Sequence, residues 1–258
     1  MSSATDPGTP ALSVRGLRVG YDGRTVLDHI DFDVARGEAF VILGGSGCGK
    51  TTLLRAIIGL IPPYEGSVLV DGAEFVGAEG ATRVAVLRKF GVLYQSGALF
   101  SSMTLLENVS LPLEEFTSLP KDAIELVART KLRLVGLEGF EAHFPSEISG
   151  GMKKRAGVAR ALALDPRILF LDEPSAGLDP ITSAELDRLI LELRDLLGTT
   201  LVVVTHELAS IYAIADRCIV LEKTRHTIVA RGKPSELRDT SDDPYVRAFF
   251  RRETMAEA

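Results

Sequence analysis

The residues with the clearest chemical potential are those of the segment GGSGCGKTT, which runs from Gly44 to Thr52. Within it Gly44, Gly49, Lys50 and Thr51 occupy the fixed places of the pattern G-x-x-x-x-G-K-[ST]. In that pattern the glycines let backbone N–H groups turn toward an anion, the lysine reaches the outer phosphates, and the hydroxyl suits Mg²⁺. The segment therefore predicts a phosphate-binding loop, with a glycine-rich turn that binds nothing as the alternative.

Short apolar segments on either side must hold this loop in place. Residues 39–43 (AFVIL) form an apolar run typical of a buried strand, and residues 52–60 (TLLRAIIGL) have the apolar recurrence of a helix packed on a sheet. A phosphate loop needs this order because the helix N-terminus adds its partial positive charge to the anion site. We therefore expect the whole loop to contact nucleotide, which adds these residues: Gly45, Ser46, Gly47, Cys48 and Thr52.

Three further strands are expected to end in polar side chains. Apolar runs lead to Gln95, to the adjacent pair Asp172 and Glu173, and to His206. Ligands of open α/β sheets bind at the carboxyl ends of strands. There Gln95 can bond to Mg²⁺ or to water, Asp172 can hold Mg²⁺, and Glu173 can deprotonate a water aimed at a terminal phosphate. His206 can bond to a phosphate oxygen. Each could instead be structural, although two adjacent carboxylates are unfavourable unless a cation lies near them.

Two other segments could contribute to a nucleotide site. Tyr21 lies just before an Asp-Gly turn signal, and could stack on an adenine ring or pack on its own hairpin. Ser149, Gly150 and Gly151 precede a helical segment, and could bind an anion or serve as an N-cap with a flexible hinge. The basic run at residues 153–155 follows at once, and its alternative interpretation is a solvated helix face.

The order of these elements indicates an α/β fold with a helical insertion, in one domain. Residues 12–34 alternate polar and apolar side chains around turns, which predicts a small antiparallel β layer ahead of the loop. The core is expected over residues 12–95 and 161–240, whereas residues 96–160 lose strand alternation and take helical spacing. Residues 241–258 indicate a short amphipathic helix followed by disorder, packed on this chain or on another.

The composition limits the class of protein and its compartment. Hydrophobic content of 46% is ordinary for a globular chain, and a formal net charge of −6 argues against bulk electrostatic binding of nucleic acid. Cys48 and Cys218 make no disulfide framework and fit a reducing compartment, with a redox role for Cys48 as the less favoured alternative. No apolar run approaches the roughly 18 to 20 residues of a membrane span. Residues 1–10 lack signal-peptide features and indicate a short disordered lead-in. We expect a soluble chain, with any membrane role supplied by a partner.

Taken together, these segments resemble the ATP-binding cassette (ABC) ATPases over residues 12–252. The motifs stand in that family's order: the phosphate loop, a Q-loop glutamine at Gln95, a signature ISGGM at 148–152, a Walker B strand ILFLDE at 168–173, a D-loop SAGLD at 175–179, and a switch histidine at His206. The resemblance implies a P-loop NTPase cassette with a RecA-like core, an N-terminal antiparallel β layer and an inserted α-helical subdomain.

The resemblance also implies a mechanism shared between two copies of the chain. They would pair head to tail around two ATP molecules with Mg²⁺, each phosphate loop facing the signature of the other copy. The implied residues are, for catalysis, Glu173, His206 and Gln95; for Mg²⁺, Thr51, Gln95 and Asp172; and for ATP, besides the loop, Tyr21, Ser149, Gly150, Gly151 and Asp179.

Longer segments resemble one subfamily, the ATPases of MCE-associated lipid transporters, the Mla type of Gram-negative bacteria. They are SGGMKKRAGVARALALDP, LDEPSAGLDPITSAELD, THELASIYAIAD and YQSGALFSSMTLLENVSLPL. Met152 stands where the family's signature usually has glutamine, and methionine at this position is common in that subfamily. Glu207 stands where an aspartate commonly follows the switch histidine. The resemblance implies phospholipid transport between inner and outer membranes, from the cytoplasmic side of the inner membrane. The implied partners are an integral-membrane permease, an MCE substrate-binding protein and, in some members, a STAS-domain protein, without nucleic acid.

Two alternatives to this function stay open, and a third is excluded by the motifs. An ABC importer or exporter with another cargo would share the ATPase chemistry and differ in its permease. Non-transport cassette proteins of DNA repair or the ribosome usually carry long coiled-coil inserts, zinc motifs or tandem cassettes, none of which this sequence has. A small-molecule kinase with a phosphate loop would lack the signature and the D-loop.

Overall fold

The computed structural model describes residues 8–253 and falls into two compact units. The first unit combines the N-terminal part of the chain, up to Arg83, with everything from Val202 onward. The second unit is continuous and spans Val84–Leu201. In the described part of the chain, no helix has both the length and the apolar character needed to cross a bilayer. The predicted lead-in at residues 1–10 and the disorder expected after the last helix lie largely outside the described residues.

The first unit contains the antiparallel layer that the sequence predicts. Its strands are β1 (Leu12–Tyr21), β2 (Arg24–Val34), β4 (Glu65–Val70) and β5 (Ala73–Glu74), in the order β2-β1-β4-β5. The Asp-Gly signal forms the turn between β1 and β2, where Tyr21 pairs with Arg24 and both Asp22 and Gly23 have positive φ. A turn of this kind matches the right-handed twist of the strands that it joins.

A second group of strands in the first unit carries the phosphate loop. β3 (Ala39–Gly44) pairs in parallel with β9 (Arg217–Glu222), which pairs in antiparallel fashion with β10 (Thr227–Gly232). All six residues of β3 are buried, which explains why its sequence is apolar throughout rather than alternating. β8 (Thr200–Val204) lies next to β3 in the strand order.

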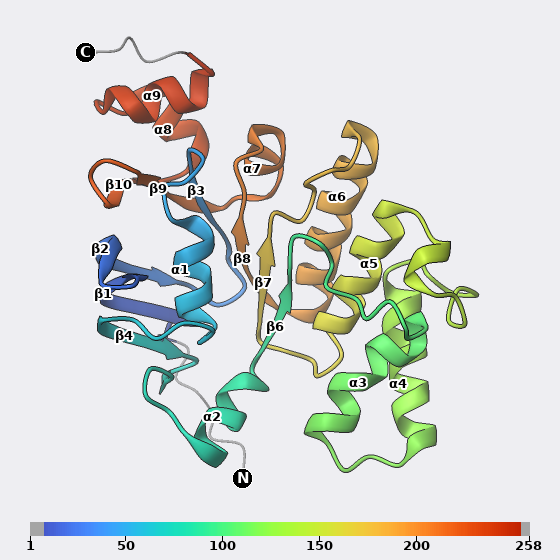
Figure 1. The fold of residues 1–258 in the computed structure, drawn as a ribbon. Helices are drawn as coiled ribbons and strands as arrows, with labels where there is room; N and C mark the ends of the chain where they lie inside the picture. The colour runs from blue at the N-terminus through green and yellow to red at the C-terminus, as the bar shows by residue number, and fades with distance from the viewer. Residues whose placement is uncertain (1–7, 254–258) are drawn as a thin grey trace. The chain divides into compact units, whose positions relative to one another are not determined.

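The helices of the first unit follow these strands closely. α1 (Lys50–Ile57) begins as soon as the phosphate loop ends, and α7 (Leu208–Ile214) follows β8. The chain then ends in α8 (Pro234–Thr240) and α9 (Pro244–Arg251), drawn in red in Figure 1, which pack on each other. α9 buries Val246 and Phe250, so the amphipathic tail helix packs on its own chain.

The second unit is mainly helical, with two parallel strands, β6 (Phe90–Leu93) and β7 (Ile168–Asp172). Helix α2 (Gly80–Leu87) leads into β6 from the boundary with the first unit. The other helices are α3 (Leu105–Phe116), α4 (Lys121–Leu134), α5 (Gly150–Ala161) and α6 (Pro180–Leu197), with a 3-10 turn at Pro145–Glu147. In Figure 1 the green helices α3 and α4 lie side by side next to α5.

The ends of these helices follow from their sequence. Thr104 and Glu107 form a capping box that starts α3, and Asp179 caps α6 by accepting bonds from two backbone N–H groups. α6 then ends at Gly198, whose φ of 65° is the left-handed conformation that glycine adopts readily. Pro180 in the first turn and Gly198 after the last turn are sequence signals for the two ends of a helix, and α6 runs between them.

Helix α5 approaches β6 so closely that Gly91 leaves no room for a side chain. A Cβ atom at Gly91 would lie 1.9 Å from the carbonyl oxygen of Ala161, at the end of α5. No real Cβ contact is that short, so the strand and the helix must move apart to admit one. The packing of α5 on the strand therefore depends on this glycine.

We predict that Gly91→Ala destabilises the protein, because one added methyl group forces α5 away from β6. Overpacking of a close contact typically costs about 1 to 3 kcal/mol. Urea denaturation followed by circular dichroism would measure the loss as a lower transition midpoint. An unchanged midpoint would show that the helix and the strand are not in the close contact described.

Candidate nucleotide-binding site

The phosphate loop depends on three glycines for its path. Gly44, Gly47 and Gly49 have φ values of 152°, 74° and 101°, a range that residues with side chains rarely adopt. Space is also limited, because a Cβ at Gly44 would lie 2.4 Å from the carbonyl oxygen of Leu221. Gly49 is the N-cap residue of α1 and has no side chain that could accept a hydrogen bond. The first backbone N–H groups of the helix are therefore not bonded to a capping side chain and can donate to another partner.

Lys50 is the charged group of the loop, and it is only 9% exposed. Its Nζ donates hydrogen bonds to the carbonyl oxygens of Gly44 at 2.8 Å and Gly45 at 3.2 Å. A buried ammonium requires such partners. The loop therefore presents glycine backbone, a helix N-terminus and a cation together, and this set of donors fits the phosphates of a nucleotide.

The residues expected to hold Mg²⁺ offer the oxygen ligands that this ion prefers. Thr51 is exposed in the first turn of α1, and Asp172 is buried at the end of β7 in the second unit. Among the described residues there is no group of three or more His, Cys, Asp or Glu side chains that could hold a metal. Mg²⁺ is usually held by only one or two carboxylates together with substrate phosphates, so the oxygen chemistry of each of these two side chains, taken by itself, suits it.

Both cysteine thiols are buried in the first unit. Burial raises the pKa of the Cys48 thiol, an effect that the nearby Lys50 only partly offsets. Burial also raises the pKa of Cys218 to about 12, and its Sγ lies 3.3 Å from the carbonyl oxygen of Gly232. Since the thiolate is the reactive form of cysteine, the redox alternative for Cys48 loses support.

Tyr21 lies close to the helix that follows the phosphate loop. Its side chain is 39% exposed, and its hydroxyl accepts a bond of 3.4 Å from Arg55 in α1. The turn beyond it is held by Tyr64, whose hydroxyl accepts a bond of 3.1 Å from the N–H of Gly23. The ring is therefore positioned next to the loop's own helix and keeps an exposed surface for stacking.

His206 follows β8, whose end lies beside β3. The N–H of Thr205 donates to the carbonyl oxygen of Ile42 at 3.3 Å, two residues before the phosphate loop. His206 itself is exposed. In the first unit, the phosphate loop and His206 thus follow the neighbouring strands β3 and β8, and Tyr21 lies beside the helix that the loop leads into.

A contact that the sequence does not reveal joins the end of the chain to the phosphate loop. The hydroxyl of Tyr245 in α9 accepts a 2.9 Å hydrogen bond from the N–H of Gly45. Asp243 caps α9 by accepting from the N–H of Tyr245 at 2.9 Å, and Arg225 forms an ion pair with this carboxylate. Burial raises the pKa of the Tyr245 phenol, so the hydroxyl stays neutral at physiological pH.

The second unit holds the other expected site residues. Asp172 ends β7, and Asp172 and Glu173 are 7% and 8% exposed. Glu173 has a φ of 47°, the left-handed conformation that a residue with a side chain rarely adopts and that marks many functional sites. Gln95 is exposed two residues beyond Leu93, where β6 ends, so the glutamine lies in the following loop rather than in the strand.

The signature segment and the D-loop end in helix caps. Ser149 is the N-cap of α5, and its Oγ accepts a 3.3 Å bond from the N–H of Met152. Asp179 accepts bonds from the N–H groups of Ile181 at 3.0 Å and Thr182 at 3.1 Å. Both side chains are therefore already bonded within their own helix ends.

The interpretation of residues 153–155 as a solvated helix face is wrong for Lys154. This lysine is 6% exposed, and its Nζ donates to the carbonyl oxygen of Glu173 at 3.1 Å and to that of Gln95. The reason is its place on the buried side of α5, since Val158 and Ala161, four and seven residues further on, are buried as well. Helical periodicity through the basic run could have identified it.

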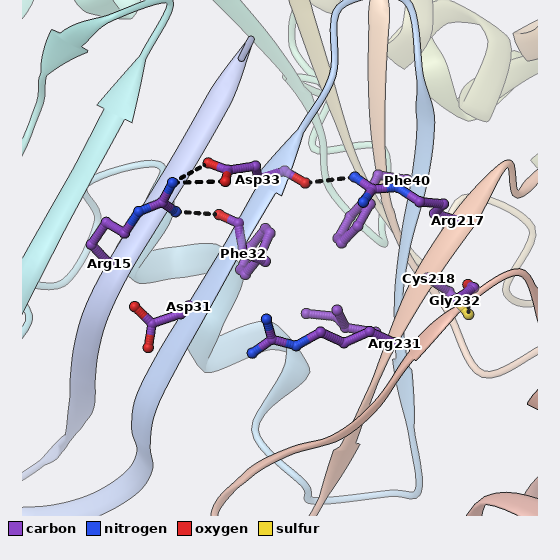
Figure 2. Close-up of a pocket in the computed structure, with 10 residues that line it drawn as sticks. Arg15, Asp31, Phe32, Asp33, Phe40, Arg217, Cys218, Arg231 and Gly232 are labelled. Carbon is purple, nitrogen blue, oxygen red and sulfur yellow. Dashed lines mark hydrogen bonds and ion pairs between the residues drawn. The ribbon is translucent and has the colours of Figure 1, made fainter. Parts of the chain in front are cut away.

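A cavity of about 300 Å³ in the first unit lies away from the phosphate loop. It opens beside Phe40, near the start of β3, whereas the loop follows the end of that strand. Figure 2 shows Arg15 bonded to both carboxylate oxygens of Asp33, at 2.6 and 2.7 Å, and Arg217 bonded to the backbone oxygen of Asp33 at 2.8 Å. Much of the charge around this cavity is thus already neutralised within the protein.

The geometry described above defines an α/β cassette with a phosphate loop, and comparison with known proteins identifies its family. A family model described as "ABC transporter" matches residues 27–176, more than half of the chain. Two solved structures are similar in fold and 30% identical in sequence. One is cbiO1 from Clostridium perfringens, part of an ABC transporter complex, with a TM-score of 0.81 over 90% of this chain and 92% of that one. The other is a dimeric cassette, MJ0796, bound to ADP and Pi, with a TM-score of 0.78 over 86% and 98%.

Curated relatives agree with this assignment. The chain is 43% identical over 239 residues to the intermembrane phospholipid transport system ATP-binding protein MlaF of Escherichia coli strain K12, covering 93% of this chain and 88% of that protein. It is 41% identical over 240 residues to the probable ribonucleotide transport ATP-binding protein mkl of Mycobacterium leprae, covering 93% and 68%. The chain belongs to the ABC transporter family, as the order of its motifs predicts.

We predict that Tyr245→Phe loosens the phosphate loop, because it removes the acceptor of the Gly45 N–H and leaves the ring of α9 in place. A hydrogen bond of this kind contributes about 0.5 to 1.5 kcal/mol, which corresponds to roughly two- to tenfold faster amide exchange. Hydrogen exchange with mass spectrometry over residues 44–52 would measure the change. Tyr212→Phe, the same substitution in α7, is the matched control, and an equal effect of both variants would contradict the prediction.

Proposed function

We propose that this chain is the ATP-hydrolysing subunit of an ABC transporter that moves phospholipid between two membranes. The observation that carries the ATPase part is the phosphate loop with its buried Lys50, in a chain that belongs to the ABC transporter family. In this proposal residues 12–95 and 161–240 form the core, residues 96–160 form the helical subdomain, and residues 241–258 form a C-terminal helix and tail.

The proposed roles follow from the chemistry of each side chain. Backbone N–H groups of the loop and Lys50 bind the phosphates, and Tyr21 stacks on the adenine. Mg²⁺, when bound near Thr51, Asp172 and Gln95, supplies positive charge that neutralises phosphate oxygens. Glu173 removes a proton from the attacking water, and Gln95 and His206 orient the water and the terminal phosphate. Glu173 suits this task because it is buried and its left-handed backbone conformation sets the direction in which the side chain leaves the chain.

The complete site is proposed to require a second copy of the chain, in a head-to-tail dimer. Ser149, Gly150 and Gly151 open α5, whose N-terminal N–H groups form a second place for an anion. Support comes from the dimeric state of the related cassette, which is 30% identical in sequence. In the dimer, ATP would be held between the phosphate loop of one copy and the signature segment of its partner, with Asp179 nearby.

Exposed aromatic side chains in the second unit favour a protein partner there. Phe100, Phe140 and Phe144 are 50%, 37% and 40% exposed. Their segments are neighbours, since the N–H of Leu105 donates to the carbonyl oxygen of His143 at 2.9 Å. We assign this aromatic patch to the integral-membrane permease, which would hold the chain on the cytoplasmic side of the inner membrane. An MCE protein and a STAS-domain protein are further proposed members of the complex.

The phospholipid cargo rests on the E. coli relative, while the mycobacterial relatives favour a second candidate. Those relatives are named for probable ribonucleotide transport, and the chain spans about two thirds of their length. The match covers 88% of the E. coli protein, against 68% and 66% of the mycobacterial ones, at slightly higher identity. We therefore propose phospholipid first and ribonucleotide second.

We predict that Glu173→Gln keeps nucleotide binding but lowers ATP turnover by at least about a hundredfold, because a positioned general base contributes on the order of 10² to 10⁴ in rate. The variant should also accumulate as a dimer in ATP and Mg²⁺, since closure no longer ends in hydrolysis. Phosphate release and size-exclusion chromatography measure the two effects. Persistent monomer in ATP would contradict the paired site.

A second variant separates binding from turnover. Lys50→Ala removes the phosphate-binding cation and should weaken nucleotide binding itself. Isothermal titration with a non-hydrolysable ATP analogue would measure the loss of affinity. Unchanged affinity in this variant would contradict the assignment of the phosphate loop.

We predict that the affinity-tagged chain, extracted from membranes in mild detergent, recovers a permease and an MCE protein together with phospholipid. Phospholipid and not ribonucleotide should stimulate ATP turnover of the reconstituted complex. Phe100→Asp should reduce recovery of the permease, because it places a charge in the aromatic patch. Leu196→Asp, at a more exposed position of α6 (68% against 50%), is the control. Recovery with a periplasmic solute-binding system would exclude the lipid cargo.

A further inference from the structure

Lys154 connects three segments that are far apart in the sequence. It lies in α5, directly after the signature segment, and its buried amine donates to the carbonyl oxygens of Gln95 and Glu173. The bond to Glu173 is 3.1 Å long. All three residues belong to the second unit. One side chain therefore holds the backbone at both the expected water-orienting glutamine and the expected general base.

The same side of α5 holds the loop that follows Gln95. A Cβ at Gly157 would lie 2.6 Å from Leu93 and 3.2 Å from the carbonyl oxygen of Gly97, so the helix and the loop are in direct contact. Arg160 donates to the carbonyl oxygens of Ala98 and, at 3.3 Å, of Gly97. Lys154 is thus the first of several contacts that fix this loop against the helix.

At Glu173 the bond from Lys154 acts on a backbone conformation that needs support. The left-handed φ of 47° is unfavourable for a residue with a Cβ atom. A hydrogen bond from an ammonium is stronger than one between neutral groups, particularly where water is excluded. Because the backbone sets the direction of the Cα–Cβ bond, the amine that holds this peptide also determines where the carboxylate is aimed.

We propose that Lys154 is a positioning residue for ATP hydrolysis, which aims Glu173 and fixes the loop of Gln95 without touching the nucleotide. This inference rests on the proposed ATPase function. In this role Lys154, the middle residue of the basic run after the signature, acts in the interior of the protein and not on a solvated helix face. The contrasting role, in which a buried lysine only stabilises the fold, predicts a loss of stability without a specific loss of turnover.

The test is the steady-state kinetics of Lys154→Met, which keeps the length of the side chain and removes the amine. We expect kcat to fall by about tenfold or more, with KM for ATP within about twofold, because the lost bonds orient the hydrolytic residues and not the phosphate loop. Lys154→Gln keeps a shorter N–H donor and should recover part of the lost kcat. If the Met variant fails to fold, the Gln variant alone still carries the comparison with wild type.

A second buried lysine in the same unit provides the matched control. Lys131 in α4 is also 6% exposed and forms an ion pair with Asp165. Lys131→Met should lower Tm, as Lys154→Met does, and leave kcat close to that of wild type. A loss of kcat that follows Tm equally in both variants would overturn the positioning role.

Parallel measurements separate this inference from the proposed function. Absence of ATP turnover in the wild-type dimer would overturn the proposed function, and with it this inference. Wild-type turnover that Glu173→Gln abolishes and Lys154→Met leaves unchanged would overturn only the role of Lys154. A selective loss of kcat in Lys154→Met, with partial recovery in Lys154→Gln, supports it.

Discussion

Buried lysine amines bonded to backbone carbonyl oxygens hold both of the loops on which the site depends. Lys50 donates to Gly44 and Gly45 in the first unit, and Lys154 donates to Gln95 and Glu173 in the second. A loop that leaves a buried strand carries carbonyl groups that need donors away from water. A flexible cation can satisfy two such groups from one side chain, at the cost of burying its own charge. The two loops differ in the groups that lie near the amine: glycine backbone around Lys50, and the backbone of a glutamine and a glutamate around Lys154.

Close packing against glycine residues supports both the phosphate loop and the loop that follows Gln95. Gly44 lets the phosphate loop pass against the end of β9, and Gly91 and Gly157 let α5 lie directly on β6 and on the following loop. In each case the missing side chain lets two segments of the chain approach each other closely. The site therefore depends on short distances between secondary-structure elements as much as on the residues expected to carry the chemistry.

The sequence predicts those parts of the structure that short-range rules determine. The phosphate loop, the Asp-Gly hairpin, the antiparallel layer and the helix from Pro180 to Gly198 all follow from residues close together in the chain. Lys154 and Tyr245 were missed because their partners lie 59 and 200 residues away, so that no local pattern reports them. Burial of Lys154 has a weak signal in helical periodicity, whereas the Tyr245 contact has none. The end of β6 before Gln95 was also missed, since an apolar run does not mark where a strand stops bonding.

The division of the chain into a continuous unit and a unit built from both ends affects how the protein is made. Strand β3 carries the phosphate loop, but its parallel neighbour β9 and the tyrosine that bonds to Gly45 are translated more than 170 residues later. The second unit, Val84–Leu201, is complete before that point. On the ribosome, therefore, all residues of the second unit are present before β9 and Tyr245, the partners of β3 and of the phosphate loop, have been translated. The phosphate loop would thus gain its contacts with β9 and Tyr245 only after both have been translated.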